Sequence, residues 1–333
     1  YRSILADENK IKGIIRDELL EIKKKFGDER RTELVEAEDD IEIEDLIERH
    51  DCVITLSHAG YIKRQPASTY AAQRRGGKGI IGAGTKEEDF IENVIVANSH
   101  SMLMMFTNRG KVHCRKAYRI PEASRTAKGT SIVNVLETEP GEKLTAVIPI
   151  DGFDENKYLV MQTLHGVIKR TKLSEFEYQR RGGKIAINLD EGDELIFVAC
   201  TDGSADILVA THDGNAARFS ESKVSVIGRT GRGVRAVKLR DGDFVIGAVV
   251  IEADEEWRKT HKIVSVTEGG FGKRVDFDQY EAKGRAIQGV LCHRLSGKTG
   301  KLCSVSCATE NDDIMIITNE GTIIRTPVAD IPV

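Results

Sequence analysis

The chain has 333 residues, of which 40% are hydrophobic and 31% charged, and its formal net charge is −4 at pH 7. It holds no apolar run near the ~18 to 20 residues of a membrane span and opens on no signal peptide, which argues against a membrane or secreted protein. Its six cysteines lack framework spacing, which disfavours a disulfide scaffold or a metal site and predicts reduced thiols in the cytoplasm.

Residues 1–27 predict an amphipathic helix. Apolar side chains recur there at mostly three- and four-residue steps, and Gly27 follows as a helix C-cap would. These side chains are Ile4, Ile11, Ile15, Leu19, Ile22 and Phe26. Such a helix needs a partner, so we expect it to pack on another helix, although a free-standing helix fits the pattern equally well. Because the chain begins inside this pattern, we expect that it was cut from a longer protein.

Residues 28–44 predict an acidic linker, extended by the repulsion between its own charges. Residues 1–50 carry 10 Lys and Arg against 16 Asp and Glu, whereas the remainder carries 39 against 37. A near-neutral remainder is compatible with a basic surface on one side, since binding depends on where the charges lie. Net charge therefore neither supports nor excludes a nucleic-acid partner.

From Asp51 onward the chain repeats one hairpin pattern six times. Each copy has an apolar strand, then Thr or Ser, two residues, Gly, three residues and usually Arg. The glycines, at steps of 48 to 56 residues, are Gly60, Gly110, Gly166, Gly214, Gly270 and Gly321. A glycine turn between β-rich runs indicates a hairpin. Six hairpins at this step predict a mainly β fold over residues 45–333, a propeller-like ring of six blades. Its last blade is expected to be incomplete, because the chain stops at Val333.

A second element, a turn rich in glycine and basic residues, follows each hairpin by about ten residues in the first five repeats. The first copy is Gln73-Arg74-Arg75-Gly76-Gly77-Lys78-Gly79, and the third repeat carries a near copy over 179–184 that lacks the final glycine. The cations suit a phosphate backbone, and the glycines let main-chain N–H groups approach it closely. For an isolated string of this kind, a solvated basic turn is the plain alternative.

The arginine four residues after the hairpin glycine occurs in five of six repeats, with Cys114 as the exception. It could pack blades together through a salt bridge. It could equally join the basic turns in a cationic stripe that follows a bent duplex by phosphate contact, without reading bases. The predicted DNA-binding residues are Gln73, Arg74, Arg75, Gly76, Gly77, Lys78, Gly79, Arg64, Arg170, Arg180, Arg181, Lys184, Arg218, Arg229, Arg232, Arg235, Arg274, Lys283, Arg285 and Arg325.

All seven residues from Gln73 to Gly79 match the GyrA box, and Val53 to Arg64 resembles the first blade of DNA gyrase A C-terminal domains. Residues 1–27 resemble the end of that family's coiled-coil arm. The resemblance implies a six-bladed β-pinwheel that wraps double-stranded DNA without sequence specificity and gives handedness to negative supercoiling. It also implies a holoenzyme of two A and two B subunits.

The resemblance places the catalytic tyrosine and the ATPase outside this chain. We therefore expect a non-catalytic part of an enzyme, with no cofactor or metal of its own, while ATP and Mg²⁺ serve the holoenzyme. Two alternatives stay open. The comparable domain of topoisomerase IV lacks an intact box, and a protein-binding propeller scaffold predicts no alignment of cations from blade to blade.

Overall fold

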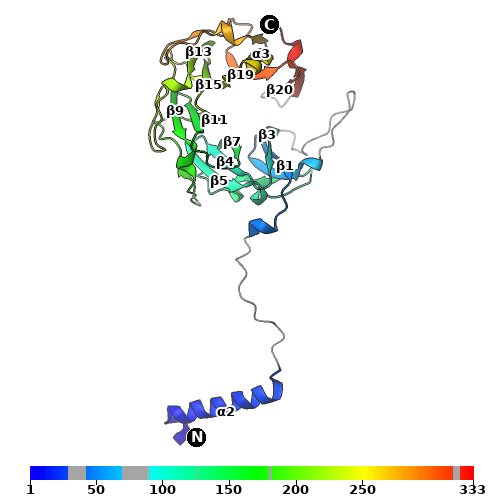
Figure 1. Cartoon of the computed structure of the whole chain (residues 1–333), viewed down its shortest axis with the longest axis vertical. Coiled ribbons are helices and arrows are strands. Elements are labelled where there is room, and N and C mark those ends of the chain that lie inside the picture. The colour runs from blue at the N-terminus through cyan, green and yellow to red at the C-terminus, as the bar shows by residue number, and fades with distance from the viewer. Residues whose placement is uncertain are drawn as a thin grey trace. The chain divides into compact units, whose positions relative to one another are not determined.

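The computed structural model describes residues 1–28, 43–69, 89, 91–124, 126–178, 180, 182–317 and 323–333. These residues form two compact units, Tyr1–Leu46 and Ile47–Val333 (Figure 1). None of the described helices is both long enough and apolar enough to cross a membrane.

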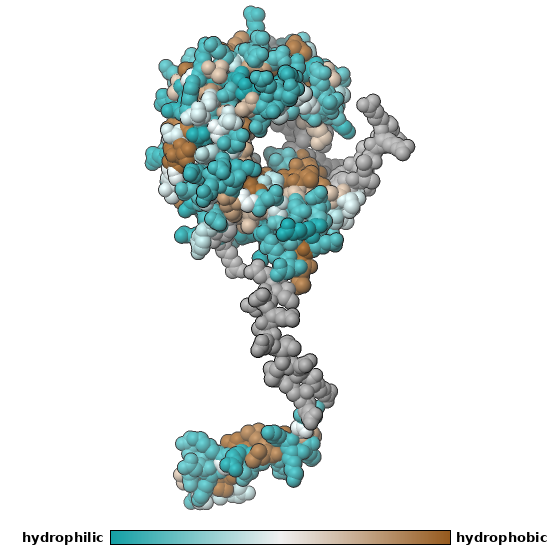
Figure 2. Space-filling model, viewed as in Figure 1, coloured by the Kyte–Doolittle hydropathy of each residue, from teal (hydrophilic) through white to brown (hydrophobic). Residues whose placement is uncertain are grey.

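The first unit is helical. It contains α1 (Arg2–Leu5), α2 (Glu8–Phe26) and the short 3-10 helix η1 (Ile43–Leu46). Asp7 caps α2, where its carboxylate accepts a hydrogen bond from the Asn9 amide at 3.0 Å. Gly27 ends the helix by donating its N–H to the Lys23 carbonyl at 2.8 Å, in an extended rather than a left-handed conformation. No side chain of α2 is buried, and Figure 2 shows apolar residues gathered along it.

We expect the acidic stretch of residues 33–45, between α2 and the second unit in the sequence, to be the first site of proteolysis. It contains no Lys or Arg from Glu33 to Asp45 but several glutamates, so a glutamyl endopeptidase is the suitable probe. Brief digestion is expected to leave a stable fragment whose N-terminal sequence begins between these two residues. A first cut inside a hairpin of the second unit, for example after Glu268 in the turn between β16 and β17, would contradict this division.

The second unit is built from short antiparallel strands. Their bounds are β1 Asp51–Ser57, β2 Tyr61–Pro66, β3 Ile91–Asn98, β4 Met102–Thr107, β5 Lys111–Lys116, β6 Thr130–Ser131, β7 Leu144–Ile150, β8 Tyr158–Thr163, β9 Val167–Lys172, β10 Lys184–Ile185, β11 Leu195–Thr201, β12 Asp206–Thr211, β13 Asn215–Ser220, β14 Val234–Arg235, β15 Val245–Ile251, β16 His261–Thr267, β17 Gly272–Val275, β18 Val290–Leu291, β19 Leu302–Thr309, β20 Asp313–Ile317 and β21 Ile323–Pro327.

Short helices accompany the strands. They are η2 Ala67–Thr69, η3 Ala117–Arg119, η4 Ile132–Asn134, η5 Leu173–Phe176, η6 Glu221–Lys223, α3 Glu255–Thr260, η7 Phe277–Gln279 and η8 Val328–Asp330. Apart from η4 and α3, each begins directly after the second strand of a hairpin or within one residue of it. Each of these six therefore marks the same point of its repeat.

Four blades have four strands each, in the orders β3-β1-β2-β6, β7-β4-β5-β10, β11-β8-β9-β14 and β15-β12-β13-β18. Within each blade the hairpin occupies the centre, and the fourth strand comes from the following repeat. Thus β6 follows β5 in the chain but pairs with β2, where Tyr61 lies opposite Ser131. In Figure 1, β9 and β13 lie outward of β11 and β15, so the fourth strands form the outer edges of the blades.

The prediction of six blades is wrong, while the mainly β, propeller-like arrangement is confirmed. The described residues form five blades, the fifth with only three strands, β17-β16-β19, and the sixth repeat supplies a two-stranded hairpin, β20-β21. The physical reason lies in how a blade is assembled. A hairpin becomes a full blade only when it gains one strand from its own repeat and a fourth strand from the next, and among the described residues β20-β21 gains neither.

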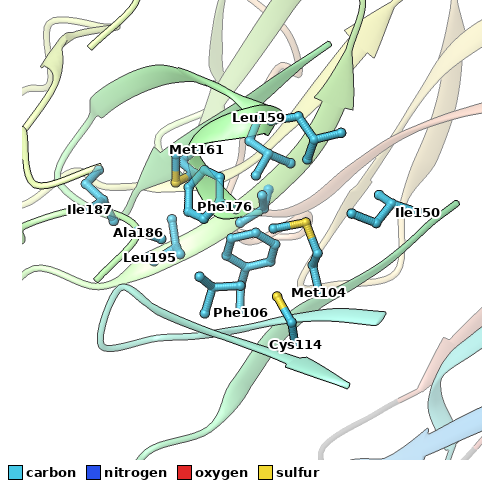
Figure 3. Packing of buried hydrophobic residues seen from close by; sticks show 13 residues of the cluster. Met104, Phe106, Cys114, Ile150, Leu159, Met161, Phe176, Ala186, Ile187 and Leu195 are labelled. Atoms are coloured by element: carbon cyan, nitrogen blue, oxygen red, sulfur yellow. The ribbon is translucent and has the colours of Figure 1, made fainter. Parts of the chain in front are cut away.

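The hydrophobic core lies between successive blades. Phe106 of β4 packs in one cluster with Met161 of β8 and Phe176 of η5 (Figure 3). Five of the six residues of β4 are buried, because neighbouring blades cover both faces of its sheet. This explains why the strands read as continuous apolar runs rather than as alternating patterns. Burying one such phenylalanine contributes about 1.5–3 kcal/mol.

Candidate nucleic-acid interface

The predicted box, Gln73 to Gly79, lies outside the described residues, as does Arg181 of the third-repeat copy. The remaining predicted residues fall in two sets with different surroundings. One set is the arginines of the hairpins, and the other is the cations of the later basic turns.

Arg218 represents the hairpin arginines. Its guanidinium donates to Asp206 Oδ2 from Nε at 3.0 Å and from Nη2 at 2.7 Å. Its Nη1 donates to the carbonyls of Phe277 at 2.9 Å and Tyr280 at 3.2 Å. These carbonyls belong to η7 and its C-terminal end, one repeat further on. Arg218 therefore ties its own strand β13 to the following repeat.

Arg64 and Arg274 make the same kind of contact. The Nε of Arg64 donates to the carbonyl of Ile120 after η3 at 3.3 Å, and that of Arg274 to the carbonyl of Ile331 after η8 at 2.7 Å. Arg170 lies 3.8 Å from the carboxylate of Glu221 in η6 and 4.8 Å from the centre of the Tyr158 ring. The structure thus favours the blade-packing role for these arginines, and DNA contact by them stays a prediction.

Exposure separates Arg325 from the other hairpin arginines. The side chains of Arg64, Arg170, Arg218 and Arg274 are 10%, 11%, 9% and 9% exposed, whereas that of Arg325 is 67% exposed. Arg325 pairs with Asp313 on the neighbouring strand of the sixth hairpin. Of these five arginines, Arg325 alone presents most of its side chain to solvent.

The basic turns share one backbone device. Gly129, Gly183, Gly233 and Gly289 directly precede the fourth strands, with φ of +92°, +76°, +100° and +79°. A Cβ at Gly233 would lie 2.6 Å from the Ile168 carbonyl oxygen, and one at Gly289 would lie 2.1 Å from that of Ala216. Only glycine fits both this conformation and this approach. Each turn is thereby pressed against the hairpin of the preceding repeat.

The cations of these turns are mostly exposed. Arg180, Arg232, Arg235 and Lys283 are exposed, and Arg229 and Arg285 are half-buried. We call these six residues the turn cations. Lys184 differs, since it is buried with its ammonium 5.4 Å from the centre of the Tyr178 ring. The turn cations come from the third, fourth and fifth repeats, and their turns lead into the fourth strands at the outer edges of the preceding repeats' blades.

Two of the turn cations form surface ion pairs, Arg232 with Asp190 at 2.9 Å and Lys283 with Glu281 at 3.2 Å. Exposed pairs contribute about 0–1 kcal/mol and are readily exchanged for another anion. A phosphate could therefore replace either carboxylate at little cost. The turns can hold several phosphates in succession along the blade edges.

Sequence reasoning missed two buried lysines beneath the turns. Lys63, 2% exposed, donates to the carbonyls of Ser124 at 3.3 Å and Ala127 at 2.9 Å. Lys169, fully buried, donates to the carbonyl of Ala186 at 2.7 Å and to that of Arg229. Burial lowers the pKa of both, that of Lys169 to about 8 with a further contribution from the Arg229 charge. The recurring Lys-Arg dipeptide after the hairpin glycine was the available signal.

No metal centre forms among the residues that the structure describes, since no three His, Cys, Asp or Glu side chains gather to hold an ion. The six cysteines are free thiols, and burial raises the pKa of Cys52, Cys200 and Cys292. Such thiols are poor nucleophiles at neutral pH.

Comparison with known proteins gives a consistent result. The family model described as "DNA gyrase C-terminal domain, beta-propeller" matches residues 53–98, 101–151, 157–202, 205–252, 261–307 and 312–333. The DNA gyrase A protein of Clostridium acetobutylicum is 48% identical over 330 residues, which cover 99% of this chain and 39% of that protein. Its counterpart in Salmonella typhimurium is 43% identical over 320 residues, covering 96% of this chain and 36% of that protein. The chain thus spans less than two fifths of the length of these relatives.

Two solved structures share the fold. The C-terminal domain of DNA topoisomerase IV superimposes with a TM-score of 0.72 at 27% identity, covering 85% of each chain. A DNA gyrase A C-terminal domain superimposes with a TM-score of 0.66 at 23% identity, covering 84% of this chain and 90% of that one. The fold of this chain thus has relatives of known structure.

Proposed function

The chain belongs to the family of DNA gyrase A C-terminal domains, and from this premise we propose that it binds and wraps double-stranded DNA along the outer edges of its blades. The observation that carries the proposal is the set of exposed turn cations at successive blade edges, each on a turn fixed by a positive-φ glycine. Contacts of this kind neutralise phosphates and read no bases, so binding is independent of sequence.

We further propose that the domain works inside a cytoplasmic gyrase holoenzyme of two A and two B subunits. A duplex that follows a curved row of cations leaves the domain with a defined direction. That direction would set the handedness of the crossing presented to the cleavage site, and hence the sign of supercoiling. ATP and Mg²⁺ would act on parts of the holoenzyme outside this chain, and no described residue of this chain is assigned a catalytic step.

The experiment that tests wrapping is closure of a nicked plasmid by ligase in the presence of the domain. If the domain wraps DNA with one handedness, the closed plasmid differs in linking number from plasmid closed alone, always with the same sign. The difference grows with the amount of bound protein and remains after the protein is removed. Plasmid closed without the domain supplies the reference distribution. An unchanged distribution at saturating protein would exclude wrapping, whatever the binding affinity.

The affinity of the domain for DNA is expected to depend strongly on salt concentration. Because the proposed contacts join Lys and Arg to phosphate, log K for a short duplex should fall against log salt concentration with a slope of about −5 to −9, corresponding to ~6 to 10 contacts. Fluorescence anisotropy of a labelled duplex at several salt concentrations measures the slope, and a second duplex of unrelated sequence should give the same value. A slope near zero would instead support a protein-binding scaffold.

The topoisomerase IV relative supports a second candidate, the corresponding domain of that enzyme, because its structure superimposes well on this chain. The intact string from Gln73 to Gly79 favours the gyrase assignment, since the topoisomerase IV domain is expected to lack it. The ligation assay separates the two. A gyrase-type domain should shift the linking number strongly, and a domain that binds DNA without completing a wrap should shift it little.

A further inference from the structure

In the first four repeats, the hairpin position three residues after the glycine is buried, beneath the basic turn of the next repeat. Lys63 occupies it in the first repeat and Lys169 in the third, and the side chains of both are almost wholly buried. A buried ammonium is costly unless its protons are taken up by hydrogen-bond acceptors. Here main-chain carbonyls of the neighbouring turns accept the hydrogen bonds that the two ammonium groups donate.

Three of the four acceptors lie within the turns themselves, and the fourth lies just after one. Lys63 binds the carbonyls of Ser124 and Ala127, which flank Arg125 in the sequence. Lys169 joins two successive turns, because Ala186 follows the third-repeat turn and Arg229 is a turn cation of the fourth repeat. The cationic side chains of Arg232 and Arg235 in the fourth-repeat turn stay exposed to solvent.

We propose that Lys63 and Lys169 are positioning residues, whose ammonium groups hold the basic turns of the next repeat in the shape that meets a phosphate. This proposal rests on the proposed function, because the shape of the turns matters only if the turns bind DNA. Neither lysine touches the phosphate itself, because both lie beneath the turn and not on its outer face.

The second repeat provides a natural comparison. His113 stands at the same position, and its ring lies where a Cβ on Gly183 would approach within 2.7 Å. Both ring nitrogens are buried and have no hydrogen-bond partner among the described residues, and burial lowers the pKa of the imidazole. A neutral ring supports the third-repeat turn by packing alone, whereas the lysines of the neighbouring repeats hold their turns by hydrogen bonds.

The charge state of Lys169 gives the inference a distinctive pH dependence. Burial and Arg229 lower its pKa to about 8, while Glu175 acts in the opposite direction. Between pH 7 and 9 the folded domain therefore loses the charge of the ammonium. DNA affinity should fall by about tenfold, which corresponds to the loss of one charge-assisted hydrogen bond.

Folding stability should change in the opposite direction. The unfolded lysine keeps its proton up to pH ~10.4, so above pH 8 the unfolded state binds more protons and stability rises with pH.

The test compares Lys169→Met with Ile168→Val, a buried control on the same strand that leaves the ammonium in place. Trypsin cleavage at Arg229 and Arg232 is followed by mass spectrometry without DNA. Affinity for a short duplex is then measured at pH 7 and pH 9 and at several salt concentrations. Lys169→Met should speed cleavage at the turn, weaken binding at pH 7 about tenfold and remove the pH dependence, with an unchanged salt slope. Ile168→Val should do none of these.

Each contrary outcome has a definite meaning. Cleavage at the wild-type rate, or a pH dependence that survives in Lys169→Met, overturns the inference. A salt slope reduced by about one overturns it as well, because it marks a direct phosphate contact. If the wild-type domain binds no duplex, the proposed function fails while the cleavage assay still decides the role of the lysine. Lys63→Met, followed by cleavage at Lys128, repeats the test in the first blade if Lys169→Met does not fold.

Discussion

Replacing Arg74, Arg75 and Lys78 with alanine should reduce the linking difference in the ligation assay far more than it reduces affinity for a short duplex. The substitutions remove about three phosphate contacts, so the salt slope should become shallower by about 2 to 3. The other turns still bind a short duplex, and its affinity should fall only modestly. A wrap, however, must be held at its ends, and a bend is lost when one end is released.

The string from Gln73 to Gly79 is the best candidate for that anchor, because it alone combines three cations with a full set of glycines. Gly76→Val and Gly77→Val should reproduce the loss without a change of charge if the turn needs positive φ or close backbone approach. Arg180→Ala, in the incomplete third-repeat copy, serves as the matched control and should remove about one contact. A parallel decline of binding and wrapping would make the string one ordinary contact, and no change in either would deny it a role.

Arg218→Ala is expected to destabilise the second unit by about 3–5 kcal/mol, because it removes one partner of a buried ion pair. Among the described residues, Asp206 would keep an ion pair only with Arg258, whose Nη2 lies 3.7 Å away, and the carbonyls of Phe277 and Tyr280 would lose a donor. Denaturant titration followed by circular dichroism measures the loss. The salt slope of DNA binding should not change at a temperature where the variant is folded.

Arg325→Ala provides the matched control, since it occupies the same repeat position with an exposed side chain. Its loss should cost less than about 1 kcal/mol. The opposite pattern, a stable Arg218→Ala domain with a salt slope shallower by about one, would restore Arg218 to the phosphate-binding set and refute the packing role.

The sequence was sufficient to identify the hairpins because their turns need a specific residue. Gly60, Gly110, Gly166, Gly214 and Gly270 all have positive φ, between +73° and +84°. Only glycine adopts such a conformation freely, so the turn leaves a signal in the sequence. The apolar strands between these turns likewise follow from burial on both faces of each blade.

The number of blades could not be obtained in this way. The fourth strands are only two residues long, as in Lys184–Ile185, and two residues carry no periodicity. Their partners, moreover, belong to the preceding repeat, so the hairpin count and the blade count differ. A pattern within one repeat cannot reveal a pairing between repeats.

The candidate site was predicted in part. Glycine and charge within one turn mark a basic loop, and Arg180 and Arg232 are exposed on such turns. The direction of a hairpin side chain depends instead on how two blades meet. The dipeptide Lys169-Arg170 shows the difficulty, because the charges of both residues face protein rather than solvent. Spacing alone left Arg170 open to a packing role or a surface stripe and did not single out Lys169.

The exchange of fourth strands also bears on the order in which the chain can fold during its synthesis. A ribosome that has completed β13 at Ser220 must still make the residues up to Val290 before the blade receives β18. At ~5–20 residues per second this interval lasts roughly 4 to 14 seconds. Throughout it β13 keeps an open edge with free main-chain donors and acceptors. Each newly made blade thus gains its fourth strand only after the following repeat has been synthesised.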